Sequence, residues 1–257
     1  MTDGELDFAG QRIIVTGAGS GIGRATAQAF ARRGASVLAV GRTPERLTET
    51  AEGRAGIHPF AADLTAEAGP AQIVAQAHER LGGIDVLVNN AGVVRPTPLG
   101  SVTGQEARRQ FETNLVAPIL LMQEALPGLE RSRGTVVNVS SAIGQRGWPA
   151  MSVYAASKAA LDSLTRVWAV ELGARGVRAV TVAPGPTRTP VLANNGYSAE
   201  QAAAAMRTQA QRYEQLPVGR MAEAEEVAWW ILAVSDRRRA AQVNGAWLPV
   251  DGGGSVS

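Results

Sequence analysis

The sequence predicts an α/β fold with a doubly wound, seven-stranded parallel sheet and helices on both faces. Short β-branched or apolar runs alternate with longer helical patterns along the whole chain, which is typical of repeated βαβ units. Some runs are apolar on both faces, as in the sequence Val-Val-Asn-Val at residues 136–139. Strands of this kind lie under helices on each side, as in a parallel sheet.

Seven segments predict strands, and segments that predict helices separate them. The strands are expected at residues 12–16, 36–40, 56–60, 85–89, 134–140, 177–183 and 246–250. The helical patterns include residues 21–33, 66–81, 105–126 and 152–175, each long enough for a crossover between parallel strands. A further helix is expected near Glu223.

The chain is expected to form a single domain over residues 1–257. Its length allows one large α/β domain or two smaller ones. No Gly/Ser-rich or Pro-rich linker and no internal repeat beyond the βαβ alternation divides the sequence. Only residues 186–217 interrupt the alternation, with prolines and an Ala-rich stretch, and we expect a lid over a binding site there.

Composition argues against several classes of function. The absence of cysteine excludes disulfides and thiolate metal sites, and His58 and His78 lack a carboxylate at ligand spacing, so no metal is expected. A net charge of +2 with scattered basic residues argues against nucleic-acid binding. The apolar runs are far shorter than the roughly 20 residues that span a bilayer, so no membrane partner is expected. No signal peptide is visible, which makes the cytoplasm the expected location.

A glycine-rich turn follows the first predicted strand. Gly17, Gly21 and Gly23 give the spacing G-x-x-x-G-x-G and run into the helical pattern at residues 21–33. Glycines in this context let the backbone approach a pyrophosphate at a helix N-terminus. The spacing departs from the usual dinucleotide fingerprint G-x-G-x-x-G, and a glycine-rich turn without a ligand is the alternative. The position between a first strand and a helix favours nucleotide binding.

The end of the second predicted strand bears on the choice of cofactor. A carboxylate that binds the ribose 2′-hydroxyl would be expected there, but the sequence has Gly41, Arg42 and Thr43. The guanidinium of Arg42 can bind a 2′-phosphate in bidentate fashion. The sequence therefore predicts NADP(H) in preference to NAD(H). The alternative is that Arg42 is an ordinary surface arginine of a βα loop.

Tyr154 and Lys158 are four residues apart on the helix predicted at residues 152–175, so their side chains share one face. A nearby ammonium and a nicotinamide cation would lower the phenol pKa from its usual value of about 10 and make the tyrosine a usable acid or base. Lys158 is the single lysine among 25 basic residues. A bare Y-x-x-x-K pattern is weak, but this bias and an upstream serine favour a functional pair. That serine ends the fifth predicted strand, and the residues leave Ser140 and Ser141 as alternatives.

Together these motifs resemble the short-chain dehydrogenases/reductases over about residues 8–253. The loop at residues 17–23 is similar to the family's TGxxxGxG motif, residues 89–92 are identical to its NNAG motif, and Asn114 occupies its helix-borne asparagine position. The resemblance implies a Rossmann fold and NADPH-dependent interconversion of a ketone or aldehyde with an alcohol by hydride transfer. It is closest to the carbonyl reductase and 3-oxoacyl-acyl-carrier-protein reductase branch.

The resemblance also implies the site residues. Tyr154 would be the general acid/base, Lys158 would lower its pKa, Ser141 rather than Ser140 would orient the carbonyl, and Asn114 would hold a water of a proton relay. Thr187 departs from the usual aliphatic residue, so a backbone contact is expected there. The cofactor contacts implied are Gly17, Ser20, Gly21, Ile22, Gly23, Arg42, Asp63, Leu64, Asn90, Ala91, Gly92, Tyr154, Lys158, Pro184, Gly185, Thr187 and Thr189.

The expected partner is a small carbonyl or alcohol substrate, and its identity is not readable from the sequence. Residues that could line its pocket are Trp148, Met151, Asn194, Asn195, Tyr197 and Met206. A homo-oligomer, dimer or tetramer, is expected, with the apolar Val167, Trp168 and Val170 at a subunit interface. The alternative function is a nucleotide-sensing regulator without catalysis on the same fold. The presence of the asparagine, serine, tyrosine and lysine together argues against it.

Overall fold

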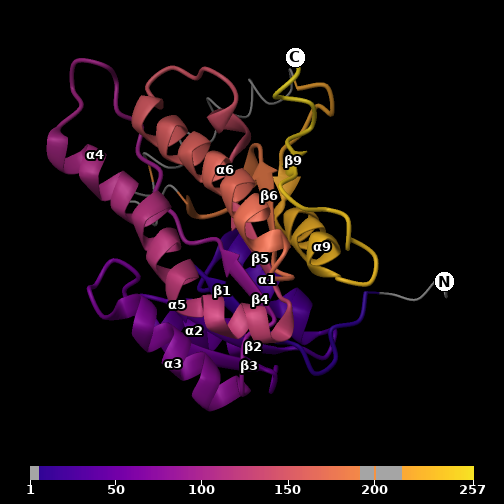
Figure 1. Ribbon diagram of the computed structural model, residues 1–257. Coiled ribbons are helices and arrows are strands. Elements are labelled where there is room, and N and C mark those ends of the chain that lie inside the picture. Colours follow the sequence, from indigo (N-terminus) through magenta and orange to yellow (C-terminus); the bar gives the residue numbers. More distant parts are fainter. Residues whose placement is uncertain (1–5, 192–199, 201–215) are drawn as a thin grey trace.

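The computed structural model describes residues 6–191, 200 and 216–257, and within them seven parallel strands form one central sheet (Figure 1). The strand order is β3-β2-β1-β4-β5-β6-β9. The strands are β1 (Arg12–Thr16), β2 (Ser36–Gly41), β3 (Ile57–Ala61), β4 (Val86–Asn89), β5 (Thr135–Val139), β6 (Arg178–Pro184) and β9 (Trp247–Val250). Each predicted strand is present within one or two residues of its expected bounds, and the doubly wound sheet is confirmed.

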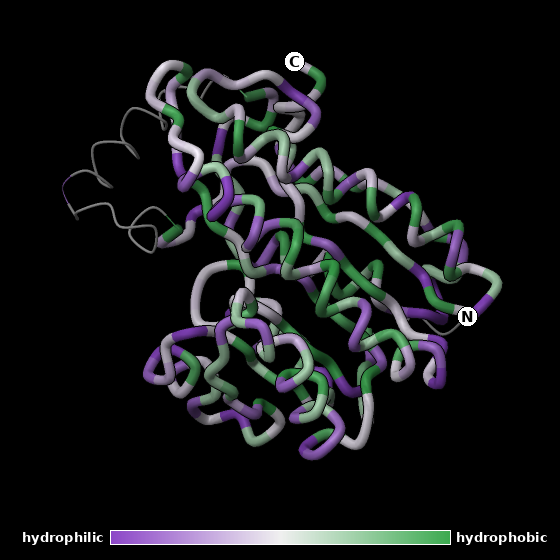
Figure 2. The backbone as a smooth tube through the Cα atoms, turned by 60° about the vertical axis from the view of Figure 1, so that its left-hand side comes forward, coloured by the Kyte–Doolittle hydropathy of each residue, from purple (hydrophilic) through white to green (hydrophobic). Residues whose placement is uncertain are grey.

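Helices cover both faces of this sheet. They are α1 (Gly21–Ala31), α2 (Pro44–Ala51), α3 (Gly69–Leu81), α4 (Gly104–Phe111), α5 (Ala117–Ser132), α6 (Ser152–Gly173) and α9 (Ala224–Ser235). Ile13 and Val15 of β1 pack in one core with Phe30 of α1 and Ile231 of α9. Ile14 packs in a second core, with residues of α3, α5 and α6. Figure 2 shows hydrophobic segments concentrated along the strands between the two helical layers.

Two helical features differ from the expectation. The helix α2 was not predicted, because its eight residues begin at a proline and carry few apolar side chains. The pattern at residues 105–126 predicts one helix, but the structure has α4, a π-helical turn at Glu112–Val116, and then α5, which continues to Ser132. Pro118 explains the interruption, because it has no N–H to donate to the carbonyl of Asn114 four residues earlier.

The predicted lid at residues 186–217 falls mostly outside the described residues. Its beginning forms β7 (Thr187–Arg188), which pairs in parallel with β8 (Ala222–Glu223) and is thereby fixed beside the start of α9. The candidate pocket residues Asn194, Asn195, Tyr197 and Met206 also lie outside the described part.

None of the helices that the structure does describe combines the length and the apolar content needed to cross a bilayer.

The expected interface on α6 is corrected at one position. Trp168 is 9% exposed and packs in the core beneath the helix, because the helical period turns it toward the sheet. Val167 and Val170 point outward, with exposed fractions of 46% and 83%. Of the three residues expected at an interface, these two valines are the exposed ones.

Candidate active site

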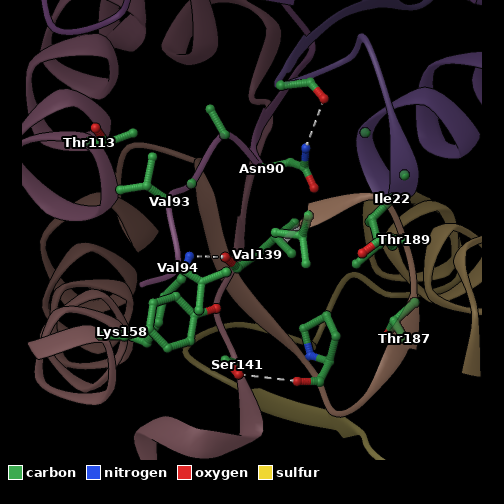
Figure 3. A pocket seen from close by; sticks show the side chains of 18 of the residues that line it. Ile22, Asn90, Val93, Val94, Thr113, Val139, Ser141, Lys158, Thr187 and Thr189 are labelled. Atoms are coloured by element: carbon green, nitrogen blue, oxygen red, sulfur yellow. Dashed lines mark hydrogen bonds between the residues drawn. The ribbon is translucent and has the colours of Figure 1, made fainter. Parts of the chain in front are cut away.

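One pocket of about 850 Å³ lies along the carboxyl ends of the sheet, where the loops after β1, β2, β4, β5 and β6 meet (Figure 3). Ligands of open α/β sheets bind at this edge, and the volume is within the usual range for a ligand site. All of the predicted site residues line it except Asn114, which lies behind the wall. The parts of the chain that sequence motifs singled out are therefore brought together in one place.

The glycine loop packs too closely for side chains at two of its positions. Gly17 has a φ of +66°, and a Cβ atom there would lie 2.8 Å from the side-chain nitrogen of Asn90. A Cβ atom on Gly23 would lie 2.2 Å from the carbonyl oxygen of Gly17. Asn90 closes the arrangement, because its side-chain amide donates to the carbonyl of Thr16 at 2.8 Å. The loop is thus held flat against the end of β4, and the backbone forms the floor of the pocket.

The N-terminus of α1 is suited to an anion. The helix begins at Gly21, has no acidic residue in its first turn, and receives no side-chain cap from Ser20. The first N–H groups of a helix lack intrahelical partners, and its dipole makes this end positive. The unpaired N–H groups and the dipole would both attract a phosphate group beside Gly21 and Ile22, and no carboxylate in the first turn would repel it.

Positive charge gathers at one end of the pocket. Arg42, which follows β2, lines this end together with Asp63 and Leu64. The carboxylate of Asp63 is engaged by Thr65, whose backbone N–H donates to it at 2.9 Å, and this bond, aided by the charge of Arg42, lowers the pKa of Asp63. Arg46 of α2 lines the same end, and it was not predicted because α2 itself was not predicted.

The hydroxyl group of Ser141 is at the opposite end. Its Oγ lies 3.4 Å from the carbonyl oxygen of Pro184, and it hydrogen-bonds the hydroxyl of Tyr154. Ser140 also borders the pocket, but its hydroxyl donates to the backbone carbonyl of Lys158 at 3.2 Å. Of the two serines that the sequence left as alternatives, only Ser141 shares a hydrogen bond with Tyr154.

Tyr154 and Lys158 lie on one face of α6, with the Lys158 ammonium 5.9 Å from the centre of the tyrosine ring. The ammonium donates to the carbonyl oxygen of Val139 at 2.9 Å (Figure 3). Burial raises the pKa of Tyr154 to about 12, although the hydrogen bond with Ser141 lowers it in part. Burial also lowers the pKa of Lys158 to about 8, against the attraction of Asp162.

The expected lowering of the tyrosine pKa is therefore not produced by the protein's own groups. The cost of removing a phenolate from water exceeds what the hydrogen bond with Ser141 returns. In this environment the phenol of Tyr154 holds its proton at neutral pH.

Asn114 lies in the π-helical turn with no exposed surface. Its side chain accepts from the N–H of Val93 at 2.8 Å and donates to the carbonyl of Val93 at 2.9 Å and to Ser157 at 3.0 Å. The amide is therefore fully engaged in holding the loop after β4. Pro118 cannot donate to the Asn114 carbonyl in the usual helical pattern.

The turn after β6 completes the pocket. Gly185 packs on the backbone of Asp251, where a Cβ atom would lie 2.7 Å from its Cα. The hydroxyl of Thr187 donates to the carbonyl of Gly185 at 3.0 Å. Trp148 and Met151 line the pocket as predicted, and Arg146 joins them with its guanidinium 5.9 Å from the Trp148 ring centre. No motif marks Arg146, and it was not predicted.

The chain is similar to known proteins over nearly its whole length. Residues 11–200 match the short chain dehydrogenase family. L-xylulose reductase of Homo sapiens is 40% identical over 252 residues, which cover 97% of this chain and 98% of that protein. The 3-oxoacyl-acyl-carrier-protein reductase of Thermotoga maritima is 34% identical over 249 residues, 95% of this chain and 97% of the relative.

A solved structure extends the likeness to three dimensions. It is a short-chain dehydrogenase/reductase of unknown function from Caenorhabditis elegans, crystallised with cofactor. It superposes with a TM-score of 0.89 at 34% identity and covers 97% of this chain and 96% of its own. By sequence and by fold, the chain belongs to the short-chain dehydrogenase family.

Proposed function

We propose that this protein is an NADP(H)-dependent oxidoreductase that interconverts a ketone or aldehyde with an alcohol. The observation that carries the proposal is the placement of Ser141, Tyr154 and Lys158 at one end of a pocket whose other end holds the glycine loop and Arg42. Because strands from residue 12 to residue 250 share one sheet, we take the chain as a single catalytic domain. The names of the reductases similar to this chain support the same reaction class.

The protein's own groups fit a nicotinamide dinucleotide. A Cβ atom on Gly17 or Gly23 would close the floor of the pocket, and the start of α1 is ready for a pyrophosphate. Hydride would come from the nicotinamide of the bound cofactor. Ser141 and Tyr154 would hydrogen-bond the substrate carbonyl oxygen, and Tyr154 would donate its proton to that oxygen as negative charge develops.

The protonation states of Tyr154 and Lys158 favour reduction at neutral pH. A pKa of about 12 keeps the phenol of Tyr154 protonated, as a general acid must be before it donates. The ammonium of Lys158 then stabilises the phenolate that remains. A water molecule on the backbone carbonyl of Asn114 would return a proton toward Lys158, as the relay implied by the resemblance requires.

The preference for NADP(H) rests on charge. Arg42 and Arg46 line the end of the pocket after β2, and no carboxylate follows Gly41 to repel a 2′-phosphate. Arg42→Ala should weaken NADPH binding about 10- to 100-fold, the usual value of a hydrogen bond to a charged group. NADH binding should be unchanged, because NADH lacks the phosphate.

Fluorescence titration of both cofactors, with wild type and Arg42→Ala side by side, tests this. Arg131→Ala removes an exposed arginine of α5 outside the pocket lining and is the matched control. Equal affinity of the wild type for both cofactors would contradict the preference. Binding without turnover of any carbonyl substrate would instead favour the nucleotide-sensing regulator.

A turnover screen should begin with small ketones and aldehydes under NADPH. L-xylulose and a 3-oxoacyl thioester are the first compounds to include, because similar reductases are named for such substrates.

We also infer that the protein is a homo-oligomer, a dimer or tetramer, in which Val167 and Val170 of α6 contribute to the contact between subunits.

A further inference from the structure

Asp162 is a buried carboxylate that none of the proposed steps uses. It lies on α6 one helical turn after Lys158 and is 1% exposed. One carboxylate oxygen accepts from the side-chain amide of Gln145 at 3.1 Å, and the Ser140 hydroxyl, which donates to the Lys158 carbonyl at 3.2 Å, lies close by. The other oxygen, Oδ1, is buried without a hydrogen-bond partner. A carboxylate that is buried and incompletely paired is costly, so its presence requires a compensating interaction.

Two cations act on this carboxylate through space, without a direct ion pair. Lys158 lies four residues before Asp162 and Arg166 four residues after it, so all three side chains lie along one face of α6. Both cations attract the carboxylate, although burial on balance raises its pKa. Lys158 is 4% exposed, whereas Arg166 lies at the surface, so the interaction with Lys158 is the less screened of the two.

The neighbours of Asp162 also bracket Ser141. Ser140 precedes it, and Gln145 follows it at the end of the short 3-10 turn Ala142–Gly144. The turn passes close to the carboxylate, because a Cβ atom on Gly144 would lie 3.3 Å from Asp162 Oδ2. The carboxylate therefore contacts both ends of the segment that carries Ser141.

We propose that Asp162 is a positioning residue of the active site, the buried counter-ion of the Lys158 ammonium and the anchor of the Ser141 turn. The inference rests on the proposed role of Lys158. Burial opposes the charged form of the Lys158 ammonium, and the charge of Asp162 favours it. Asp162 thus keeps Lys158 in the protonated form in which it can support the Tyr154 phenolate.

The test is the proton affinity of Lys158 in Asp162→Asn, which removes the charge and keeps the shape. Because the chain has a single lysine, its reactivity with acetic anhydride can be followed by mass spectrometry on one peptide as a function of pH, without cofactor. The midpoint of wild-type acetylation should lie near the value of about 8 that burial gives the Lys158 pKa. In Asp162→Asn it should fall by about one pH unit or more.

Two control variants separate charge from packing. Gln145→Leu breaks a hydrogen bond to the carboxylate but leaves its charge, so the Lys158 midpoint should stay where it is. Arg166→Gln removes a positive charge on the other side of Asp162, which makes the surroundings of Lys158 more negative. The acetylation midpoint of Lys158 should therefore not fall. An unchanged midpoint in Asp162→Asn, or an equal fall in Gln145→Leu, would overturn the proposal.

A second variant covers the case in which Asp162→Asn does not fold. Lys158→Met leaves Asp162 buried without its counter-ion, so ionisation of the carboxylate then opposes folding. Its thermal midpoint should fall as the pH rises from 5 to 8, because stability tied to a raised carboxyl pKa is lost with increasing pH. The double variant Lys158→Met, Asp162→Asn should lack this dependence, and parallel pH profiles of the two variants would refute the charge pairing.

Activity gives an independent readout. Reductive turnover of Asp162→Asn should be depressed at pH 8 and recover toward wild type near pH 6, where Lys158 regains its proton. The acetylation and stability measurements need neither turnover nor cofactor. The counter-ion inference can therefore fail while the proposed oxidoreductase activity stands, and the reverse can be recognised as well.

Discussion

Tyr154 is the residue on which the proposed chemistry depends most directly. Tyr154→Phe keeps the ring that packs in the pocket and removes only the hydroxyl that bonds Ser141. Loss of a general acid should lower kcat by about 10²- to 10⁴-fold. The dissociation constant for NADPH should stay within about twofold of wild type, because the ring and the other expected cofactor contacts remain. Steady-state kinetics and a fluorescence titration measure the two quantities, and turnover at the wild-type rate would remove Tyr154 from its proposed role.

Most site residues could be predicted because they lie in short motifs whose chemistry is local. The glycine loop and the tyrosine and lysine pair are of this kind. The residues alone left Ser140 and Ser141 open and the family resemblance selected Ser141; the backbone after β5 turns that hydroxyl toward Tyr154. Arg146 and Asp162 could not be predicted, because their proximity to the site depends on the turn after β5 and on helix packing.

The packing of α1 against the glycine loop makes a prediction at the scale of elements. Gly23→Ala would place a Cβ atom 2.2 Å from the carbonyl oxygen of Gly17 and 2.4 Å from the side-chain nitrogen of Asn90. The start of α1 must then move away from the loop, which should cost about 1–3 kcal/mol of stability and weaken cofactor binding at least tenfold. Thermal denaturation and cofactor titration measure these effects.

Gly147→Ala is the matched control, because a Cβ atom there has open space around it. Its melting temperature should equal that of the wild type within a degree or two. If Gly23→Ala were equally harmless, the glycine would not be required for the close approach of α1 to the loop.

Regular elements with strong apolar patterns could be predicted from the sequence, and irregular ones could not. The strands β1, β4 and β5 are buried on both faces, so their apolar runs are unmistakable. The short helix α2 buries only Leu47 and Thr50 and is otherwise mostly polar, so few apolar residues mark it as a helix. The π-helical turn before α5 depends on the missing N–H of Pro118, and the proline alone does not tell whether a helix ends or bends.

At the scale of the molecule, alternation of strands and helices was enough to predict the layers, because each face of a parallel sheet must be covered. The sequence determines less well which apolar residues lie at the surface. Apolar residues along a helix face indicate burial, yet the same pattern does not separate burial in the core from burial in an interface. Trp168 belongs to the first case, and Val167 and Val170 are left exposed on the outer face of α6.

The exposed valines give the last prediction, on the assembly of the protein. Val170 is 83% exposed, and a contact between two copies of α6 would remove its apolar surface from water. Val170→Glu would bury a charge in that contact and should shift the protein toward monomers, by at least tenfold in the dissociation constant measured by sedimentation velocity. Leu99→Glu changes a residue that is 93% exposed before α4 and should leave the assembly intact. A monomeric wild type would refute the oligomer itself. An intact oligomer in Val170→Glu would instead move the contact to another surface, of which the half-exposed pair Trp229 and Trp230 on α9 is the next candidate.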